Sequence, residues 1–322
     1  MAKSSKDIKE LKKMHDTERK SFEKEHNKLS KQDNIVAETE NKISAVDYYN
    51  SLSDGEKREF QDQLQKKKLR ESYISYLKYV YGDKYIITPF HRVLANVCQS
   101  VVERIEKGEK IRICLSVPPR HGKSQTVSNT LPSWYLGRNP DSSVIITGYN
   151  ADIAENFGNN NRELVREFGK DIFGVEISDS QDNKTEFALK KHKGYCLSVG
   201  LLGGITGRGG SLIIVDDPFK NGEEANNQTL RSRISSVFKD SVLTRLEGKG
   251  NAVIVIHTRW HEEDLIGELA KTGDWLVINI PAVWEKGTDK LLHRKIGETL
   301  CPELGYDSEW AMMTEKAIWH RK

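Results

Sequence analysis

Short apolar runs alternate with amphipathic segments through the middle of the chain. The runs typical of strands cover residues 111–117, 143–149, 211–216, 252–257 and 275–280, and strand character also extends over 186–199. The segments with helical spacing cover residues 123–136, 151–168, 227–246 and 262–271. Uninterrupted apolar runs suit strands that are buried on both faces of a parallel sheet. The alternation therefore predicts an α/β fold with three layers, in which helices cover both faces of a mainly parallel sheet.

Residues 1–55 depart from this alternation. Charged residues of both signs dominate the segment, and a single apolar stripe recurs at intervals of seven. The second apolar position that a coiled-coil heptad needs is polar here. The segment is therefore expected to be a charged helical arm, which is either solvated and partly frayed or docked on a partner protein.

The rest of the chain divides into two expected parts. Residues 56–80 have the spacing of an amphipathic helix, which opens an α/β domain over residues 56–285. Past Ala282 the periodic signal fades, and residues 286–322 are expected to be a linker or a small lid subdomain. A total of 322 residues fits one large domain with such extensions.

Composition narrows the class of protein. Hydrophobic residues make up 37% of the chain and charged residues 30%, so a sizeable core is possible. The four cysteines form no CxxC pair, which suits a reducing compartment. No apolar run reaches the ~20 residues that span a bilayer, so no membrane association is expected. A net charge of +3 neither supports nor excludes binding to nucleic acid.

The strand at 111–117 runs into the sequence Val-Pro-Pro-Arg-His-Gly-Lys-Ser, which ends at Ser124 and precedes a predicted helix. A strand, a tight turn ending in Gly-Lys-Ser and a helix form a phosphate-binding loop, although Val117 replaces the usual first glycine. Lys123 would bind the β- and γ-phosphates of a nucleotide, and the Ser124 hydroxyl would bind Mg²⁺. The other residues of this segment expected to contact nucleotide are Pro119, Arg120, His121, Gly122 and Gln125.

Two carboxylates end the apolar run at 211–216. Acidic residues at the carboxyl end of a parallel strand lie in the crevice where open α/β sheets bind ligands. Asp216 is expected to hold Mg²⁺, in part through water, and Asp217 is expected to orient or deprotonate an attacking water. The alternative is an ordinary buried strand that runs into an Asp-Asp-Pro turn. The Gly-Lys-Ser sequence about ninety residues earlier favours the nucleotide site.

A third strand, at 252–257, also ends in polar residues. Thr258 and Arg259 follow it directly and are candidates for sensing the γ-phosphate and passing its loss to a moving part. His257 and His261 have a spacing that unites zinc ligands on a helix. Because a strand ends here, the two imidazoles are not expected to share a face.

Together these residues resemble the ATPase domain of the large terminase subunit, the motor that packages DNA in tailed bacteriophages. The resemblance covers roughly residues 70–285. It rests on Pro118 to Ser124, Thr206-Gly-Arg-Gly209, Ile213 to Pro218, Thr258-Arg-Trp-His261 and Thr88-Pro-Phe-His91. The last of these resembles the family's adenine segment, which implies that Pro89 and His91 contact the base.

The resemblance assigns the loop lysine, the loop serine and the metal-site carboxylate to Lys123, Ser124 and Asp216. Many members of the family have Glu after the metal-site Asp, whereas this chain has Asp217. The catalytic carboxylate is therefore expected to be Asp217, and the alternative is that Glu223 or Glu224 folds back from the following loop. Thr258 takes the place of the family's coupling motif.

An arginine is also expected to neutralise the charge that develops on the transferred phosphoryl group. Arg120 lies inside the phosphate loop and would act within its own subunit. Arg208 resembles the family's candidate finger, which a neighbouring subunit in a ring supplies. Arg245 is a third candidate.

The resemblance implies an Mg²⁺-dependent ATPase that drives translocation of double-stranded DNA in the host cytoplasm. The implied partners are further copies of the chain in a ring, the viral portal protein and the small terminase subunit. No segment resembles the nuclease domain of the family, so DNA cleavage is not expected. Two alternatives remain open, a helicase-like DNA-remodelling ATPase and a non-catalytic nucleotide-binding module that orders an assembly.

Overall fold

The computed structural model describes residues 47–205 and 207–307. The chain divides into two compact units, Met1–Gln63 and Leu64–Lys322. Most of the charged arm expected at 1–55, residue 206 of the Gly-rich segment and the end of the chain past 307 lie outside the described residues.

The described part of the first unit leads into helix α3 (Asp54–Glu71). Ser53 and Glu56 form a capping box at its start, because the Ser53 N–H donates to Glu56 Oε2 at 2.8 Å. The ring of Phe60 packs against Tyr48 and Tyr49.

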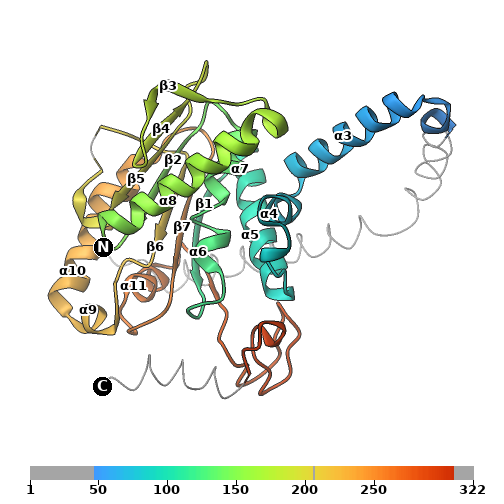
Figure 1. Ribbon diagram of the computed structural model, residues 1–322. Coiled ribbons are helices and arrows are strands. Elements are labelled where there is room, and N and C mark those ends of the chain that lie inside the picture. Colours follow the sequence, from blue (N-terminus) through green and yellow to red (C-terminus); the bar gives the residue numbers. More distant parts are fainter. Residues whose placement is uncertain (1–46, 206, 308–322) are drawn as a thin grey trace, which may run out of the picture. The chain divides into compact units, whose positions relative to one another are not determined.

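An eight-stranded sheet forms the centre of the second unit (Figure 1). The strands lie in the order β3-β4-β5-β2-β6-β7-β1-β8. Their bounds are β1 Lys110–Ser116, β2 Ser143–Gly148, β3 Ile177–Asp182, β4 Glu186–Leu189, β5 Tyr195–Gly200, β6 Leu212–Asp216, β7 Asn251–His257 and β8 Leu276–Asn279. All neighbouring strands are parallel except at β4, which runs antiparallel to β3 and to β5.

Helices cover both faces of this sheet. The helices are α4 Tyr73–Tyr81, α5 Pro89–Glu106, α6 Lys123–Thr126, α7 Leu131–Arg138, α8 Ala151–Leu164, α9 Gly222–Asn226, α10 Gln228–Val237 and α11 Leu265–Thr272. Successive strand residues point to opposite faces, so Leu212 and Ile214 of β6 enter one core while Ile213 and Val215 enter the other. The predicted three-layer α/β fold with a mainly parallel sheet is confirmed.

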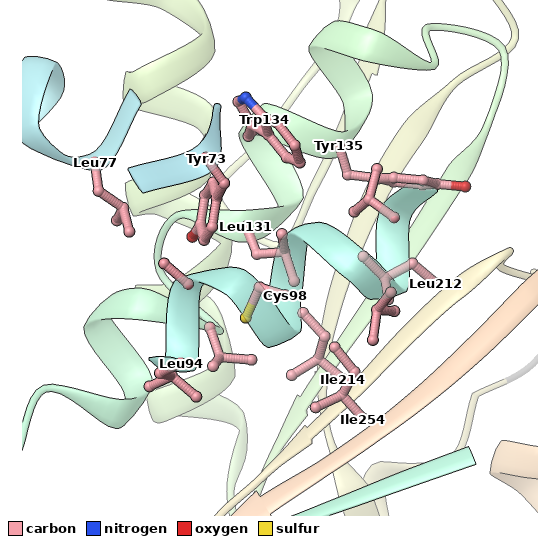
Figure 2. Close-up of a cluster of buried hydrophobic side chains, with 14 of the residues drawn as sticks. Tyr73, Leu77, Leu94, Cys98, Leu131, Trp134, Tyr135, Leu212, Ile214 and Ile254 are labelled. Atoms are coloured by element: carbon pink, nitrogen blue, oxygen red, sulfur yellow. The ribbon is translucent and has the colours of Figure 1, made fainter. Parts of the chain in front are cut away.

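The larger core lies on the face covered by α4, α5 and α7. Figure 2 shows part of it, with Leu94 and Cys98 of α5 close to Tyr73, Ile214 and Ile254. The opposite core packs the second face of the strands against α10 and α11. In the described residues, no helix is both long and apolar enough to cross a membrane.

Three helices predicted as continuous are interrupted in the structure. The helix expected at 123–136 ends at Thr126 and resumes at Leu131, because Pro132 has no N–H to donate to the carbonyl of Ser128. That carbonyl accepts a bond of 2.8 Å from the Asn161 amide instead. The helix expected at 56–80 breaks at Ser72, which caps α4. The one expected at 227–246 forms α10 up to Val237 and then continues as one wider and one tighter turn.

The edge of the sheet also differs from the prediction. The segment expected to have strand character at 186–199 is an antiparallel pair, β4 and β5, and β3 extends it as an edge strand. Strand β3 has the sequence Ile-Ser-Asp-Ser-Gln-Asp, and none of its residues is fully buried. Polar residues keep an exposed edge from pairing with another chain, and they also remove the apolar signal by which a strand is found.

The described part of the segment past 285 packs onto the α/β unit. Leu300 and Cys301 are buried in the larger core. The Tyr306 hydroxyl donates to the carbonyl of Arg120 at 3.0 Å, and the Tyr306 ring lies 5.0 Å from the ring of His121. The segment therefore contacts the predicted phosphate loop directly.

Candidate active site

The candidate site lies at the carboxyl ends of three adjacent strands, β6, β7 and β1. The segment 117–122 follows β1, Asp216 and Asp217 end β6, and Thr258 follows β7. Parallel strands bring their carboxyl ends to the same edge of the sheet, so residues far apart in the sequence meet there.

The loop between β1 and α6 obtains its tight turn from two left-handed residues. Arg120 has a φ of 64° and Gly122 a φ of 71°. Val117, where a first glycine is usual, keeps the strand pairing through its N–H, which donates to the carbonyl of His257 at 3.4 Å. The loop therefore does not need a glycine at position 117. The His121 ring folds back within the loop, with Nδ1 2.8 Å from the carbonyl of Pro119.

Gly122 is also fixed by a close approach from α5. A Cβ at this position would lie 2.9 Å from His91 Nε2. The His91 ring is held from its other side, where Nδ1 lies 2.8 Å from Thr88 Oγ1 in a capping box at the start of α5. Burial, with a smaller effect of His121, lowers the pKa of His91 to about 4. His91 is thus a neutral support of the loop in this structure, while Pro89 is exposed as the first residue of α5.

The side chain of Lys123 joins the loop to β6. It is buried and forms ion pairs with Asp217 and, at 3.6 Å, with Asp216. Burial alone would lower the pKa of the Lys123 ammonium, but the charges of Asp217 and Asp216 raise it above its ordinary value. The expected convergence of Lys123 and Asp216 is therefore present in the structure.

Asp216 is fully buried, and complete burial raises the pKa of its carboxyl against the opposing effect of Lys123. Its Oδ2 accepts a hydrogen bond from Ser128, whereas its Oδ1 has no donor within hydrogen-bond distance among the described residues and faces the Lys123 ammonium at 3.6 Å. The Ser124 hydroxyl lies close enough to lower the pKa of the same carboxyl. A buried carboxylate oxygen without a donor is costly, and carboxylate and hydroxyl oxygens are ligands of Mg²⁺. Asp216 and Ser124 therefore fit a magnesium ion.

Ser128 is a site residue that the sequence reasoning missed. It is fully buried, and its position four residues after Ser124 is the only sequence signal for its presence on the same face.

Replacing Ser128 by alanine is expected to lower the free energy of unfolding by about 1–3 kcal/mol, because Asp216 Oδ2 then has no donor. Urea unfolding followed by circular dichroism measures the change. Ser236 makes the same kind of bond to Asp240 at 2.8 Å on the surface. Ser236→Ala is therefore the matched control and should change stability by less than about 0.5 kcal/mol. Equal effects of the two variants would show that burial of the Asp216 carboxylate is not decisive.

Asp217 connects the loop lysine to the third strand. Its backbone is left-handed, with a φ of 41°, and its Oδ1 accepts a 3.1 Å hydrogen bond from the N–H of Thr258. The Thr258 hydroxyl in turn donates to the carbonyl of Val117 at 3.3 Å. Asp217 and Thr258 therefore form a direct bridge between β6, β7 and the start of the loop.

The alternative carboxylates, Glu223 and Glu224, lie in the first turn of α9. Glu224 caps its own helix α9, since its Oε2 accepts a bond of 2.8 Å from the N–H of Lys220. Glu223 is exposed in the first turn of the same helix. The role of Glu224 as a catalytic carboxylate therefore stays a prediction. Asn221 caps the start of α9, and the Glu224 side chain is bonded to the backbone just before that helix.

The candidate arginines occupy different parts of the unit. Arg120 is exposed on the loop, shortly before Lys123 in the sequence. Arg208 pairs with Glu186 at 2.6 Å and lies over the ring of Tyr195, at the amino-terminal end of β5. Arg245 lies near the same edge, where its carbonyl accepts the N–H of Gly210. Arg120 therefore lies on the loop at the carboxyl ends of the strands, whereas Arg208 and Arg245 lie near the amino-terminal ends of the strands.

The remaining predicted residues flank the group. Gln125 lies on α6, where its Oε1 accepts a bond of 3.2 Å from the Asn129 amide. Arg259 pairs with Asp264, with Nε 2.8 Å from Oδ2, and it lines a cavity with Val117 and Pro118. Asp264 is fully buried and also caps α11 through the N–H of Gly267, so the sequence reasoning missed a structural anchor here.

Comparison with known proteins identifies one family. The family described as "Terminase large subunit, T4likevirus-type, N-terminal" matches residues 114–316. Two solved structures are similar. The large terminase of bacteriophage HK97 is 13% identical with a TM-score of 0.42, over 72% of this chain and 47% of that one. The large terminase of a thermophilic bacteriophage is 13% identical with a TM-score of 0.37, over 61% and 45%.

The chain spans about half the length of these solved proteins. A further structure of the large terminase from the thermophilic bacteriophage, in complex with ATP-gamma-S, is 12% identical with a TM-score of 0.36, over 60% of this chain and 44% of that one. No curated protein matches the sequence.

Proposed function

Because the chain belongs to the terminase large-subunit family, we propose that it binds ATP with Mg²⁺ at the Lys123 site and hydrolyses it to drive double-stranded DNA translocation during viral genome packaging. The observation that carries this proposal is the meeting of Lys123, Asp216 and Asp217 at the carboxyl end of a parallel sheet. A lysine after a tight loop and two strand-end carboxylates are the parts that phosphoryl transfer requires.

Each residue of the group takes one role in this proposal. Lys123 binds the β- and γ-phosphates, while Ser124 and Asp216 hold Mg²⁺. When bound, Mg²⁺ supplies positive charge that neutralises the phosphate oxygens. Asp217 orients the attacking water and accepts its proton on a carboxylate oxygen.

Because Lys123 and Asp217 form an ion pair, ATP must bind before Asp217 can act on water. A triphosphate offers Lys123 a stronger negative partner, so its arrival frees Asp217 Oδ2 for the water. Asp217 Oδ1 stays bound to the N–H of Thr258, which links hydrolysis to the end of β7. Thr258 is thus the residue through which loss of the γ-phosphate reaches the rest of the unit.

The arginines divide between the two sides of a subunit contact. Arg120 is placed to act on the nucleotide of its own loop. Arg208 lies at the amino-terminal end of β5, away from the Lys123 site of its own subunit, so it acts on the site of a neighbouring copy in a ring. The portal protein and the small terminase subunit are the proposed partners of that assembly.

The direct test is phosphate release from ATP by the purified chain, with and without double-stranded DNA. We expect release that requires Mg²⁺, stops when EDTA removes the metal, and rises with added DNA. Binding of ATP without any release, even with DNA present, would instead identify a non-catalytic nucleotide module. Separation of duplex strands during hydrolysis would identify a helicase-like enzyme.

A further inference from the structure

A groove on the surface of the second unit is distinct from the nucleotide site. It has a volume of about 890 Å³ and is formed by the end of α3, by α4, by the turn at 82–84 and by the start of α5. Its apolar residues include Ile74, Tyr79, Ile86 and Ile87, and its charged residues are Lys68, Lys78, Arg92 and Asp83.

The apolar floor of the groove faces solvent. Ile86 is 55% exposed and Tyr79 is 41% exposed, although both side chains are large and apolar. Small-molecule sites enclose most of their ligand, whereas this floor leaves Ile86 and Tyr79 exposed to solvent. Open apolar floors of this kind receive the side chains of one face of a helix.

The charges around the floor have one dominant sign. Lys68 and Arg92 are exposed and have no ion-pair partner among the residues that the structure describes. Lys78 pairs with Asp83 at 2.7 Å, which leaves two cations uncompensated. A bound segment with acidic residues beside an apolar stripe would pair with these two cations and cover the apolar floor.

We propose that this groove binds an acidic amphipathic helix of a partner protein. The apolar stripe of the helix would cover Ile86 and Tyr79, and its acidic residues would pair with Lys68 and Arg92. A DNA backbone fits less well, because phosphates would pair with the cations but would leave the apolar floor uncovered or place it against charge.

The groove connects to the phosphate loop through hydroxyl groups. Tyr85 lines the groove, and its hydroxyl is hydrogen-bonded to Thr126 Oγ1. Thr126 Oγ1 donates to the carbonyl of Gly122 at 2.9 Å, directly before Lys123. Tyr85 is itself buried, so a helix bound in the groove acts on the loop by shifting Tyr85, and bound nucleotide changes the groove in return. This second step rests on the proposed function.

Fluorescence anisotropy tests the groove without nucleotide. The probe is a labelled helical peptide of about 16 residues, built of Leu, Ala and Glu with leucines at i, i+3, i+4 and i+7 spacing. We expect it to bind the full chain, and its affinity to fall at least about tenfold in Ile86→Asp and in the double variant Lys68→Glu with Arg92→Glu. A twin peptide with Lys in place of Glu should bind at least about tenfold more weakly.

Matched controls separate the groove from general surface effects. Ile296 is 67% exposed elsewhere, so Ile296→Asp is the apolar control, and Lys190→Glu with Lys193→Glu is the charge control. Both should keep wild-type affinity. Equal loss in the controls, no binding of the acidic peptide, or displacement of the peptide by duplex DNA would overturn the groove as a helix site.

The connection has its own readout. ATP should change the affinity of the chain for the peptide by some factor, and the peptide should change the affinity for ATP by the same factor. Tyr85→Phe removes the hydroxyl and should abolish this factor while peptide binding without nucleotide stays unchanged. Persistence of the factor in Tyr85→Phe would overturn the connection and leave the groove. A chain that binds the peptide but never binds ATP would refute the proposed function alone.

Discussion

Replacing Lys123 by alanine is expected to lower the rate of ATP hydrolysis at least about 100-fold. In the proposed reaction the ammonium group meets charge that develops on the phosphates, and removal of one such preorganised group costs a factor of about 10²–10³. Phosphate release at saturating ATP, measured beside the wild-type chain, gives the effect on the chemical step. Lys190→Ala is the control, because Lys190 is an exposed lysine that pairs with Asp179 and with neither site carboxylate.

The same change removes the counter-ion of two neighbouring carboxylates. Asp216 and Asp217 would then repel each other, and breaking a buried pair by removing one partner costs about 3–5 kcal/mol. Lys123→Gln keeps a hydrogen-bond donor near both carboxylates. It should therefore stay folded even if the loss of stability unfolds Lys123→Ala. Circular dichroism of both variants separates a folding defect from a catalytic one. Hydrolysis at the wild-type rate by a folded Lys123→Gln chain would contradict the site assignment.

The sheet and the site could be predicted because their signals are local. Each central strand is an apolar run, and the loop after Ser116 together with the polar residues that follow Val215 and His257 marks the carboxyl ends where ligands bind. Parallel pairing then brings Lys123 and Asp216 together without any further information. The strand positions of the central sheet therefore followed from the sequence to within one residue or two.

Other features could not be predicted because they depend on contacts between distant segments. Ser128 becomes a partner of Asp216 only after α6 breaks and β6 passes beside it. The edge strand β3 is polar, and its pairing with β4 is decided by the neighbouring strand rather than by its own sequence. The contact of Glu224 depends on local folding in the same way, since its bond to the N–H of Lys220 forms only when α9 is in place.

The left-handed residues of the site show how sequence signals can mislead. A missing glycine at Val117 weakened the motif, yet the turn is made at Arg120 and Gly122. Arg120 and Asp217 hold left-handed backbones without being glycine, which costs on the order of 1–3 kcal/mol each and is tolerated mainly at functional sites. Both residues flank Lys123 in the proposed reaction, and their strain is consistent with a loop held ready for a ligand.

Replacing Asp217 by asparagine is expected to lower the hydrolysis rate by about 10²–10⁴, the usual contribution of a general base. Asparagine keeps the hydrogen bond from the N–H of Thr258 and the size of the side chain, so the loss reports on the charge. Glu224→Gln is the matched control, because it neutralises the rival carboxylate and leaves an acceptor for the N–H of Lys220; it should hydrolyse ATP within about twofold of the wild type. Single-turnover phosphate release, with ATP binding measured separately, distinguishes loss of chemistry from loss of affinity. A large loss in Glu224→Gln together with near-normal hydrolysis in Asp217→Asn would transfer the catalytic role to α9 and require that helix to unfold when nucleotide binds.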